Sequence, residues 1–349
     1  MAGSDPTAPI ARARAGDGEA FRELTEPYRR ELQVHCYRML GSVQDAEDTV
    51  QETLLAAWQA FGGYTAERAS LRTWLYKIAT NRCLNALRSG CRRSARGWDV
   101  AAVKAPEPTR LGEVVWLQPY PDALLEGVAG ATSGPGAPGA PLGPEARYEQ
   151  AESISLAFVT ALQVLPPRQV AVLILRDVLG FHAGEVAGML EATVESVNSA
   201  LKRARASLRR QLPPGDGREP PPAAGSPAED AVVTRFVTAW QSADLDALVA
   251  LLTDDAFVSM PPMPFEYAGR DAVVSLVASL FGSGRRFDLV PARANGQPAF
   301  GAYLRSADGI RHGIGLYVLT LSGDRIRAMT RFEASVLPWF GLPRSLPAR

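Results

Sequence analysis

The segment DAEDTVQETLLAAW, residues 45–58, is followed a short distance later by SLRTWLYKIATNRCLNALR, residues 70–88. In both segments apolar residues recur every three or four positions, which predicts two amphipathic helices of a small helical bundle. One side of the first helix presents an acidic stripe, formed by Asp45, Asp48, Gln51 and Glu52. A solvated helix face whose carboxylates are favoured by the helix dipole gives the same pattern, so the stripe alone leaves both interpretations open.

The second segment carries the opposite charge. Residues 69–98 contain no Asp or Glu, while arginines and Lys77 stand beside Trp74, Tyr76 and Asn81. Basic and aromatic side chains interleaved in this way suit unpaired nucleic acid, because cations neutralise phosphates and aromatic faces stack on bases at about 1–3 kcal/mol each. Trp74 taken by itself also fits a place in the core of the bundle.

Together the two segments resemble region two of the extracytoplasmic-function sigma factors. In that family the acidic helix docks on the clamp helices of the RNA polymerase β′ subunit, and the loop and helix that follow capture and melt the minus-ten promoter element. The resemblance implies polymerase contacts at Asp45, Glu47, Asp48, Gln51 and Glu52. It implies promoter contacts at the loop 61–70 and at Arg72, Trp74, Tyr76, Lys77, Asn81 and Arg82.

A second pattern, LGFHAGEVAGMLEATVESVNSALKRAR, spans residues 179–205. It predicts a short helix over 183–190, a turn at Glu191 and Ala192, and a second helix capped by the hydroxyl of Thr193. The side chains expected to be buried on the second helix are Val194, Val197, Leu201 and Leu208. Its outward face carries short polar side chains near the start and cations near the end, which suits a recognition helix in the major groove. An amphipathic helix with a basic end, which the helix dipole also favours, is the simpler alternative.

This unit resembles region four of the same sigma factors, which reads the minus-thirty-five promoter element. The recognition helix is expected to contact DNA through Thr193, Ser196, Asn198, Ser199, Lys202 and Arg203. Two positions depart from the family's pattern, because Glu191 stands where the turn usually has Gly and Ala200 stands where the helix usually has Arg. Base-specific contacts are therefore not transferred from the family.

Two stretches rich in Pro and Gly, residues 127–144 and 213–227, indicate flexible or extended linkers. They divide the chain into three modules. The expected boundaries are a region-two helical domain at 1–98, a linker at 99–146, a region-four helix-turn-helix domain at 147–212, a Pro-rich linker at 213–228 and a C-terminal domain at 229–349.

The first linker contains the apolar segment WLQPYPDALL, residues 116–125, which is too short to form a core and must pack against another part. Similar segments in sigma factors with a C-terminal extension thread polymerase or contact that extension. We expect interdomain contacts at Trp116, Leu117 and Tyr120, and at Trp339 in the apolar tail LPWFGLP, residues 337–343. The C-terminal domain is accordingly expected to restrain the other two.

The C-terminal domain has a mixed pattern. Helical periods at 231–242, 245–252 and 271–281 are accompanied by β-like runs at 287–294, 299–305, 314–321 and 325–332. These runs predict an antiparallel sheet behind helices, an α+β arrangement. With FVTAW at 236–240, LLTDDAF at 251–257, MPPMP at 260–264 and YAGRD at 267–271, the domain resembles SnoaL-like domains, cones of curved sheet with helices. That fold includes cyclases, isomerases and noncatalytic ligand binders, so the fold alone does not choose among them.

An enzyme of this shape needs an acid or base in an apolar pocket. The candidates are few, namely Asp255, Asp308, His312 and Glu333, and each is of a type more common at a surface or in a loop. No catalysis is therefore expected, although a small-molecule ligand of this domain stays possible.

The composition sets further limits. The net charge is +0, so attraction to DNA must come from local basic patches. Cys36, Cys83 and Cys91 are odd in number and lack histidines at ligand spacing, so we expect no disulfide framework, metal or cofactor. No apolar run approaches the roughly 20 residues that span a bilayer, and the N-terminal residues lack an apolar signal, so a cytoplasmic location without membrane contact is expected.

These observations predict a multidomain protein with two all-α sigma domains, a helical bundle and a helix-turn-helix, and an α+β SnoaL-like cone. The predicted function is that of a sigma factor that binds core RNA polymerase through its β′ clamp helices and β subunit, recognises promoter DNA, and is regulated by the SnoaL-like domain. The alternative is a helix-turn-helix regulator fused to a SnoaL-like cyclase or isomerase. A simple DNA-binding regulator leaves the acidic helix unexplained.

Overall fold

The structure is a computed structural model that describes residues 8–89, 105–112, 116–125, 153–212, 219–282 and 284–348. These residues form two compact units. The first unit contains the described residues 8–89, 124–125, 153 and 157–212, and therefore holds both helical regions expected from the sequence. The second unit contains the C-terminal part from residue 219 onward, together with the linker residues 105–112, 116–123 and 154–156. The Gly- and Pro-rich stretch 127–144 lies outside the described residues.

The first half of unit one is a helical bundle. Its helices are α1 (Ala8–Arg14), α2 (Gly18–Leu40), α3 (Val43–Ala60) and α4 (Leu71–Ser89), with a short 3-10 turn η1 (Phe61–Gly63) after α3. Gly41 ends α2 in a left-handed conformation with φ 69°, and the Ser42 hydroxyl accepts from Asp45 N to start α3. Because the C-cap of α2 is followed directly by the N-cap of α3, the chain reverses there and the two helices lie side by side. Helix α4 packs against both.

The core of this bundle contains a buried histidine. His35 has no exposed surface, its Nε2 lies 2.9 Å from Thr80 Oγ1, and its ring meets Tyr76 edge-on. Burial lowers the pKa of His35 to about 3, helped by the nearby charges of Arg38 and Arg72. The imidazole is therefore neutral in the folded protein.

Acid should weaken this bundle through His35. Because the folded pKa lies below the unfolded value of about 6.5, its contribution to stability is complete above pH 6.5 and is lost as the pH falls toward 3. At pH 5.5 we expect the free energy of opening of α2, measured by hydrogen exchange, to be lower by about 1.4 kcal/mol than at pH 7.5. His35→Gln should lose this part of the pH dependence. If the free energy of opening of α2 depends on pH as strongly in His35→Gln as in the wild type, His35 is not the source of the acid sensitivity.

The second half of unit one contains α6 (Leu156–Gln163), α7 (Pro167–Leu173), the π-helical turn η3 (Ile174–Val178), α8 (Ala183–Leu190) and α9 (Val194–Gln211). The predicted helix-turn-helix is confirmed, because α8 ends at Leu190 and Thr193 caps α9 by accepting from Ser196 N at 3.2 Å. The predicted buried face of α9 was partly wrong. Val194 is 40% exposed because it lies in the first turn, before the helix reaches its neighbours, and Leu208 is half-buried. The buried side chains of α9 are Val197, Leu201 and Ala204.

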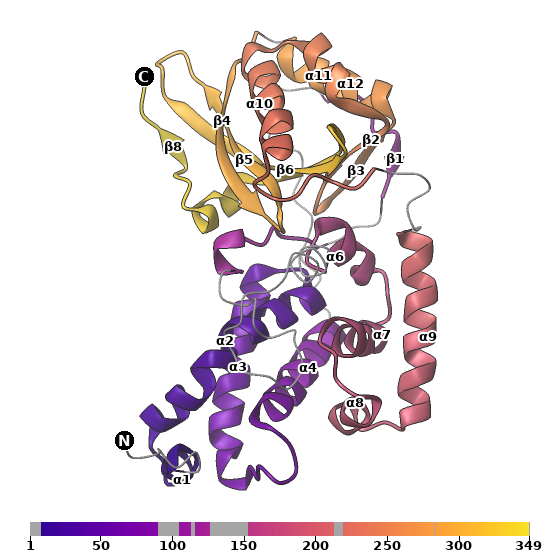
Figure 1. Cartoon of the computed structure of the whole chain (residues 1–349). Coiled ribbons are helices and arrows are strands. Elements are labelled where there is room, and N and C mark those ends of the chain that lie inside the picture. The colour runs from indigo at the N-terminus through magenta and orange to yellow at the C-terminus, as the bar shows by residue number, and fades with distance from the viewer. Residues whose placement is uncertain are drawn as a thin grey trace. The chain divides into compact units, whose positions relative to one another are not determined.

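Unit two is built on a curved sheet covered by helices. Its helices are α10 (Pro227–Ser242), α11 (Leu245–Leu251) and α12 (Arg270–Phe281). Its strands are β1 (Arg110–Leu111), β2 (Leu252–Met260), β3 (Met263–Ala268), β4 (Phe287–Ala294), β5 (Gln297–Arg305), β6 (Arg311–Ser322), β7 (Arg325–Phe332) and β8 (Ser345–Leu346). The strand order is β1-β3-β2-β7-β6-β5-β4, and β8 pairs with β6. The helices gather on one side of the sheet (Figure 1).

The predicted α+β architecture is confirmed, and the four β-like runs expected to form an antiparallel sheet, which are β4 to β7, do pair antiparallel. β2 and β7 are parallel, so the sheet is mixed. β2 starts directly where α11 ends, so the helical pattern predicted over 245–252 gave no sign that a strand begins there. Between helices and sheet lies an aromatic core that includes Phe236, Trp240, Phe300 and Tyr317. These rings contact one another in tilted arrangements at centroid distances of 5.2–5.5 Å.

The apolar C-terminal tail packs on its own unit. It forms the 3-10 helix η4 (Ala334–Phe340) and the strand β8. Leu337 and Leu342 are buried against β5 and β6, where a Cβ at Gly301 would come within 2.6 Å of Leu342 Cδ1. The bare glycine backbone is therefore what lets the tail approach. Trp339 points outward and is 37% exposed.

None of the described helices is both long enough and apolar enough to cross a membrane.

Candidate nucleic-acid interface

The acidic helix α3 leaves most of its carboxylates in solvent. Glu47, Asp48, Gln51 and Glu52 are exposed, and Asp45 is half-buried near the helix start. The opposite side of α3 buries small and β-branched residues, including Ala46, Val50 and Ala57. This packing fixes the acidic stripe on the outside of the bundle.

The sequence interpretation missed one member of this surface. Leu55 lies one helical turn after Gln51 and Glu52 and is 58% exposed. An apolar side chain surrounded by carboxylates is suited to a protein partner rather than to DNA. Helical periodicity could have predicted the exposure of Leu55, because the buried stripe of α3 passes through residues 50, 53 and 57 and leaves residue 55 outside.

The basic helix α4 carries the side chains that the resemblance assigned to promoter DNA. Trp74 lies in an aromatic cluster, with ring centroids 5.1 Å from Tyr64 and 5.9 Å from Phe61, and is half-buried. Arg82 is exposed and its guanidinium lies 3.9 Å from Glu52 on α3. A pair this long and this open contributes little to stability. Arg82 therefore stays available to a phosphate.

Arg72 and Tyr76 lie deeper. The Arg72 guanidinium lies 4.9 Å from the ring centroids of both Tyr76 and Phe181, and its Nε lies 3.2 Å from the Glu31 carboxylate. Burial raises the pKa of Glu31, and the charge of Arg72 opposes this rise. Tyr76 has no exposed surface in this structure.

The helix-turn-helix presents a polar face. Ser196, Asn198, Ser199, Lys202 and Arg203 are all exposed on α9, while Thr193 serves as the cap and is exposed at the start of the helix. Arg205, one turn further on, is engaged with Asp177 at 2.7 Å. Lys202 and Arg203, by contrast, form no ion pair or hydrogen bond with the residues that the structure describes.

Most of the described linker residues belong to unit two. β1 adds to the sheet edge by pairing with β3, and Tyr267 Oη donates to Pro106 O at 2.9 Å. Leu117 is 5% exposed and Tyr120 is fully buried. The apolar segment that the sequence left without a core therefore finds one in the C-terminal unit.

The turn between β4 and β5 holds this linker. Asn295 and Gly296 have φ of 57° and 72°, the conformation of a two-residue type I′ turn. Asn295 Oδ1 accepts from Tyr120 N at 2.8 Å, its Nδ2 donates to Ile154 O at 2.7 Å, and its backbone N donates to Tyr120 O at 2.9 Å. One buried side chain thus joins two linker segments that are 34 residues apart. We call this arrangement the linker clamp.

Charged groups extend the linker clamp. Asp122 accepts from Gly296 N at 2.8 Å and from Arg293 Nε at 3.3 Å. Arg293 also donates to Glu229 Oε2 at 2.7 Å, and that carboxylate is almost wholly buried. Burial raises the pKa of Asp122, while the Gly296 amide and Arg293 counteract the rise. The three side chains tie the linker to α10 as well as to the turn.

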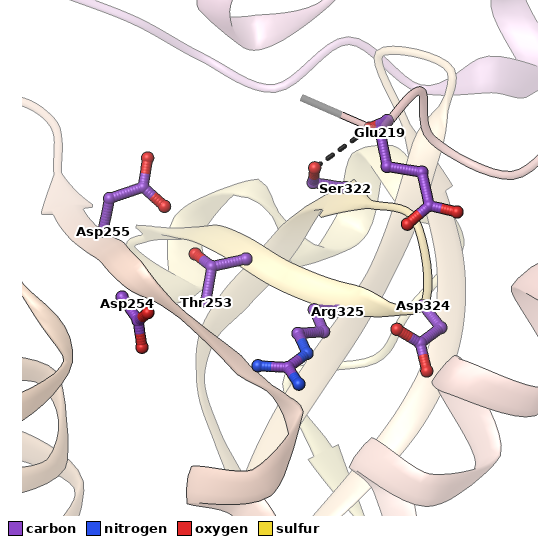
Figure 2. A pocket seen from close by; sticks show the side chains of 7 residues that line it. All are labelled: Glu219, Thr253, Asp254, Asp255, Ser322, Asp324 and Arg325. Carbon is purple, nitrogen blue, oxygen red and sulfur yellow. Dashed lines mark hydrogen bonds between the residues drawn. The ribbon is translucent and has the colours of Figure 1, made fainter. Parts of the chain in front are cut away.

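One hollow on the surface of unit two is polar. It has a volume of about 380 Å³ and is lined by Glu219, Thr253, Asp254, Asp255, Ser322, Asp324 and Arg325. Figure 2 shows these side chains around an open surface site, with Ser322 donating to the main chain of Glu219 at 3.0 Å. Such a hollow has no apolar wall that would raise the pKa of a carboxylate.

The four candidate acids and bases of unit two do not converge. Asp255 lies 3.6 Å from Arg327 and is largely exposed, Asp308 caps an exposed turn, and His312 Nδ1 lies 3.2 Å from Ser345 Oγ. Glu333 precedes η4 on the tail side. None of the four belongs to the aromatic core between helices and sheet.

Comparison with known families accounts for all three parts of the chain. Residues 24–93 match Sigma-70 region 2, residues 155–208 match Sigma-70 region 4, and residues 233–334 match the SnoaL-like domain. Regions two and four on one chain define a transcription initiation factor of the sigma-70 class, here with an added SnoaL-like domain.

The ECF RNA polymerase sigma factor SigG of Mycobacterium tuberculosis is 41% identical over 96% of this chain and 86% of its own length. SigJ of the same organism is 29% identical over 82% of both chains. The crystal structure of that SigJ has the same fold, with a TM-score of 0.55 and 24% identity over 89% of this chain and 95% of its own. The chain belongs to the ECF RNA polymerase sigma factors.

The predicted fold class, the predicted family and the predicted sigma-factor function are therefore confirmed: the protein is a sigma factor, a class that binds core RNA polymerase and promoter DNA. The match to region two also explains the acidic helix, which the alternative of a helix-turn-helix regulator fused to an enzyme did not.

Proposed function

We propose that this sigma factor binds core RNA polymerase through the exposed face of α3 and engages the β′ clamp helices there. The observation that carries this proposal is the outward stripe of Glu47, Asp48, Gln51 and Glu52 around the exposed Leu55. Carboxylates steer the encounter with a basic partner, and a central apolar side chain adds desolvation energy. Asp45 contributes from the edge of this surface, and region four is proposed to contact the β subunit.

Promoter DNA is proposed to bind at two places. The basic helix α4 and the loop 61–70 capture the minus-ten element with Arg72, Trp74, Tyr76, Lys77, Asn81 and Arg82. The recognition helix α9 reads the minus-thirty-five element with Thr193, Ser196, Asn198 and Ser199, while Lys202 and Arg203 hold phosphates. The exposed side chains of α9, ordered from short polar to cationic, support this division.

Replacing Lys202 and Arg203 together by Ala should weaken binding to all promoters alike. Each lost phosphate contact lowers the slope of log affinity against log salt by about 0.9, so the slope should fall by nearly two. Titrating several promoter duplexes at different salt concentrations measures this change. Ser199→Ala serves as the comparison and should alter the preference among promoters. A promoter-selective effect of the Lys202 and Arg203 change would contradict the assignment.

The SnoaL-like domain is proposed to regulate the factor by holding its linker. Support comes from the linker clamp, in which Asn295 bonds to both Tyr120 and Ile154 within the second unit. A linker held in this way is withheld from polymerase, so the held and released forms compete. Trp116 and Leu117 add apolar contacts to the held form, whereas Trp339 is proposed to contact another part of the assembly.

We propose no catalytic step for this domain. The scattered, exposed positions of Asp255, Asp308 and His312 support this view, as does the absence of an apolar wall in the described hollow. The factor is proposed to act in the cytoplasm, where polymerase and chromosome meet.

The proposal is tested by transcription with purified core polymerase. Start sites mapped with and without the chain should differ by discrete, chain-dependent initiations, and a chain lacking these activities would give the same background in both reactions.

A further inference from the structure

The promoter-melting helix α4 is covered in this structure. Within unit one, α4 lies beside α7 and α8 (Figure 1). The ring of Phe181, which leads into α8, meets the ring of Tyr76 at 5.2 Å and stands 4.9 Å from the Arg72 guanidinium. Tyr76 is fully buried and Phe181 is 5% exposed. Two side chains proposed to contact the minus-ten element are thus occupied by region four.

A polar stripe of α4 is occupied in the same way. Thr73, Lys77 and Asn81 are spaced by four residues and share one helix face. Thr73 Oγ1 lies 3.4 Å from Glu185 Oε1, Lys77 Nζ lies 3.6 Å from Glu191 Oε1, and Asn81 Nδ2 donates to Met189 O at 3.5 Å. All three partners belong to α8 or to the turn that follows it.

The turn residue Glu191 carries an unusual conformation. Its φ and ψ are 50° and 52°, in the left-handed region where a side chain with a Cβ is disfavoured. A glycine would adopt this turn without strain. The glutamate instead places a carboxylate opposite Lys77, so the strained residue is the one that reaches the basic helix.

This arrangement is incompatible with bound promoter DNA. The elements at minus ten and minus thirty-five are about 25 base pairs apart, which at about 3.4 Å per pair places them on the order of 80 Å apart. Side chains of α4 and of the helix-turn-helix that contact each other at 3.4–3.6 Å cannot serve both elements at once. The contacts described above must break before transcription starts.

We propose that the helix-turn-helix doubles as a cap on α4, with Glu191 as its latch, so that the factor masks its own promoter-melting surface when it is free. The cap rests on the proposed promoter role of α4. It acts within unit one and is separate from the linker clamp of unit two. Region four of the same chain covers α4, and the contacts of Phe181 and the Lys77–Glu191 pair hold it there.

A zero-length carbodiimide crosslink tests the capped state directly. The sequence holds only three lysines, Lys77, Lys104 and Lys202, so a mass-spectrometric map of the full chain is simple. We expect an amide between Lys77 and Glu191 in the free protein, absent in Glu191→Gln and strongly reduced when core polymerase is bound. Because the crosslink is measured without promoter DNA, its outcome does not depend on whether the proposed promoter role of α4 is correct. If the free chain gives no crosslink between Lys77 and Glu191, the proposed cap is wrong.

Opening the latch should uncover α4. Glu191→Gln keeps the size of the side chain and removes the ion pair, so we expect the full chain to bind a single-stranded minus-ten oligonucleotide about two- to five-fold more tightly by fluorescence anisotropy. Glu195→Gln is the matched control, because it removes the same charge from an exposed position of α9 that forms no hydrogen bond or ion pair with the described residues of α4. A gain confined to Glu191→Gln supports the latch. Equal gains in both variants, or no gain in either, overturn it.

Discussion

Reversing two carboxylates of α3, Asp48→Lys with Glu52→Lys, should abolish binding to core RNA polymerase. Both side chains are exposed and flank Leu55, so the change places cations where the basic partner surface is proposed to dock. Like charges in an interface cost several kcal/mol, and a cost of about 3 kcal/mol already lowers affinity about 100-fold. Fluorescence titration of labelled core polymerase measures this loss.

The fold should tolerate the double reversal. The contact made by Glu52 within the bundle is a 3.9 Å pair with Arg82, and both partners are largely exposed. Reversing Glu23 and Glu26 on α2 changes the net charge equally and serves as the control. Wild-type affinity in the Asp48 and Glu52 variant, or equal losses in both variants, would remove α3 from the polymerase interface.

Releasing the linker is expected to have the next largest effect. Asn295→Gly keeps a residue that tolerates φ of 57° and removes the side chain that bonds to Tyr120 N and Ile154 O. Each buried backbone group left without a partner costs about 1–3 kcal/mol, so the held form should lose on the order of 2–6 kcal/mol. That loss moves the balance toward the released form by about 30-fold or more.

Hydrogen exchange at residues 116–122 should accelerate in this variant, and the apparent affinity for core polymerase should rise. Asp308→Gly alters another turn of the same unit, away from the linker, and should change neither. If exchange accelerates while the affinity for polymerase stays at the wild-type value, the linker is held without restraining the factor. Regulation by the SnoaL-like domain would then need a different contact.

The sequence was most informative where structure is local. The helical periods of α3, α4 and α9 and the cap at Thr193 depend on neighbours within a few positions, so their residues could be assigned without a fold. β2 was harder to predict, because it follows α11 without a breaker and pairs in parallel with β7, about 70 residues later. An Asn-Gly pair between two strands does predict a turn, but its grip on Tyr120 depends on contacts across the chain.

The same limit applies to the surfaces. Exposure of Glu47, Asp48 and Glu52 follows from helical geometry, whereas the burial of Tyr76 depends on Phe181, which lies 105 positions away. Glu191 was recognisable as a departure from the family's turn. Its contact with Lys77 could not be predicted from the sequence, because that contact depends on the packing of α8 beside α4.

Single-round transcription at limiting core polymerase, with start sites mapped for the wild-type chain and for Asn295→Gly, tests both promoter recognition and its restraint by the C-terminal unit. We expect discrete, chain-dependent start sites that are the same for both proteins, with a higher yield from Asn295→Gly that disappears when polymerase is in excess. A chain that adds no discrete start sites would contradict its assignment as a promoter-directing factor. Equal yields at every polymerase concentration would contradict the restraint exerted by the C-terminal unit.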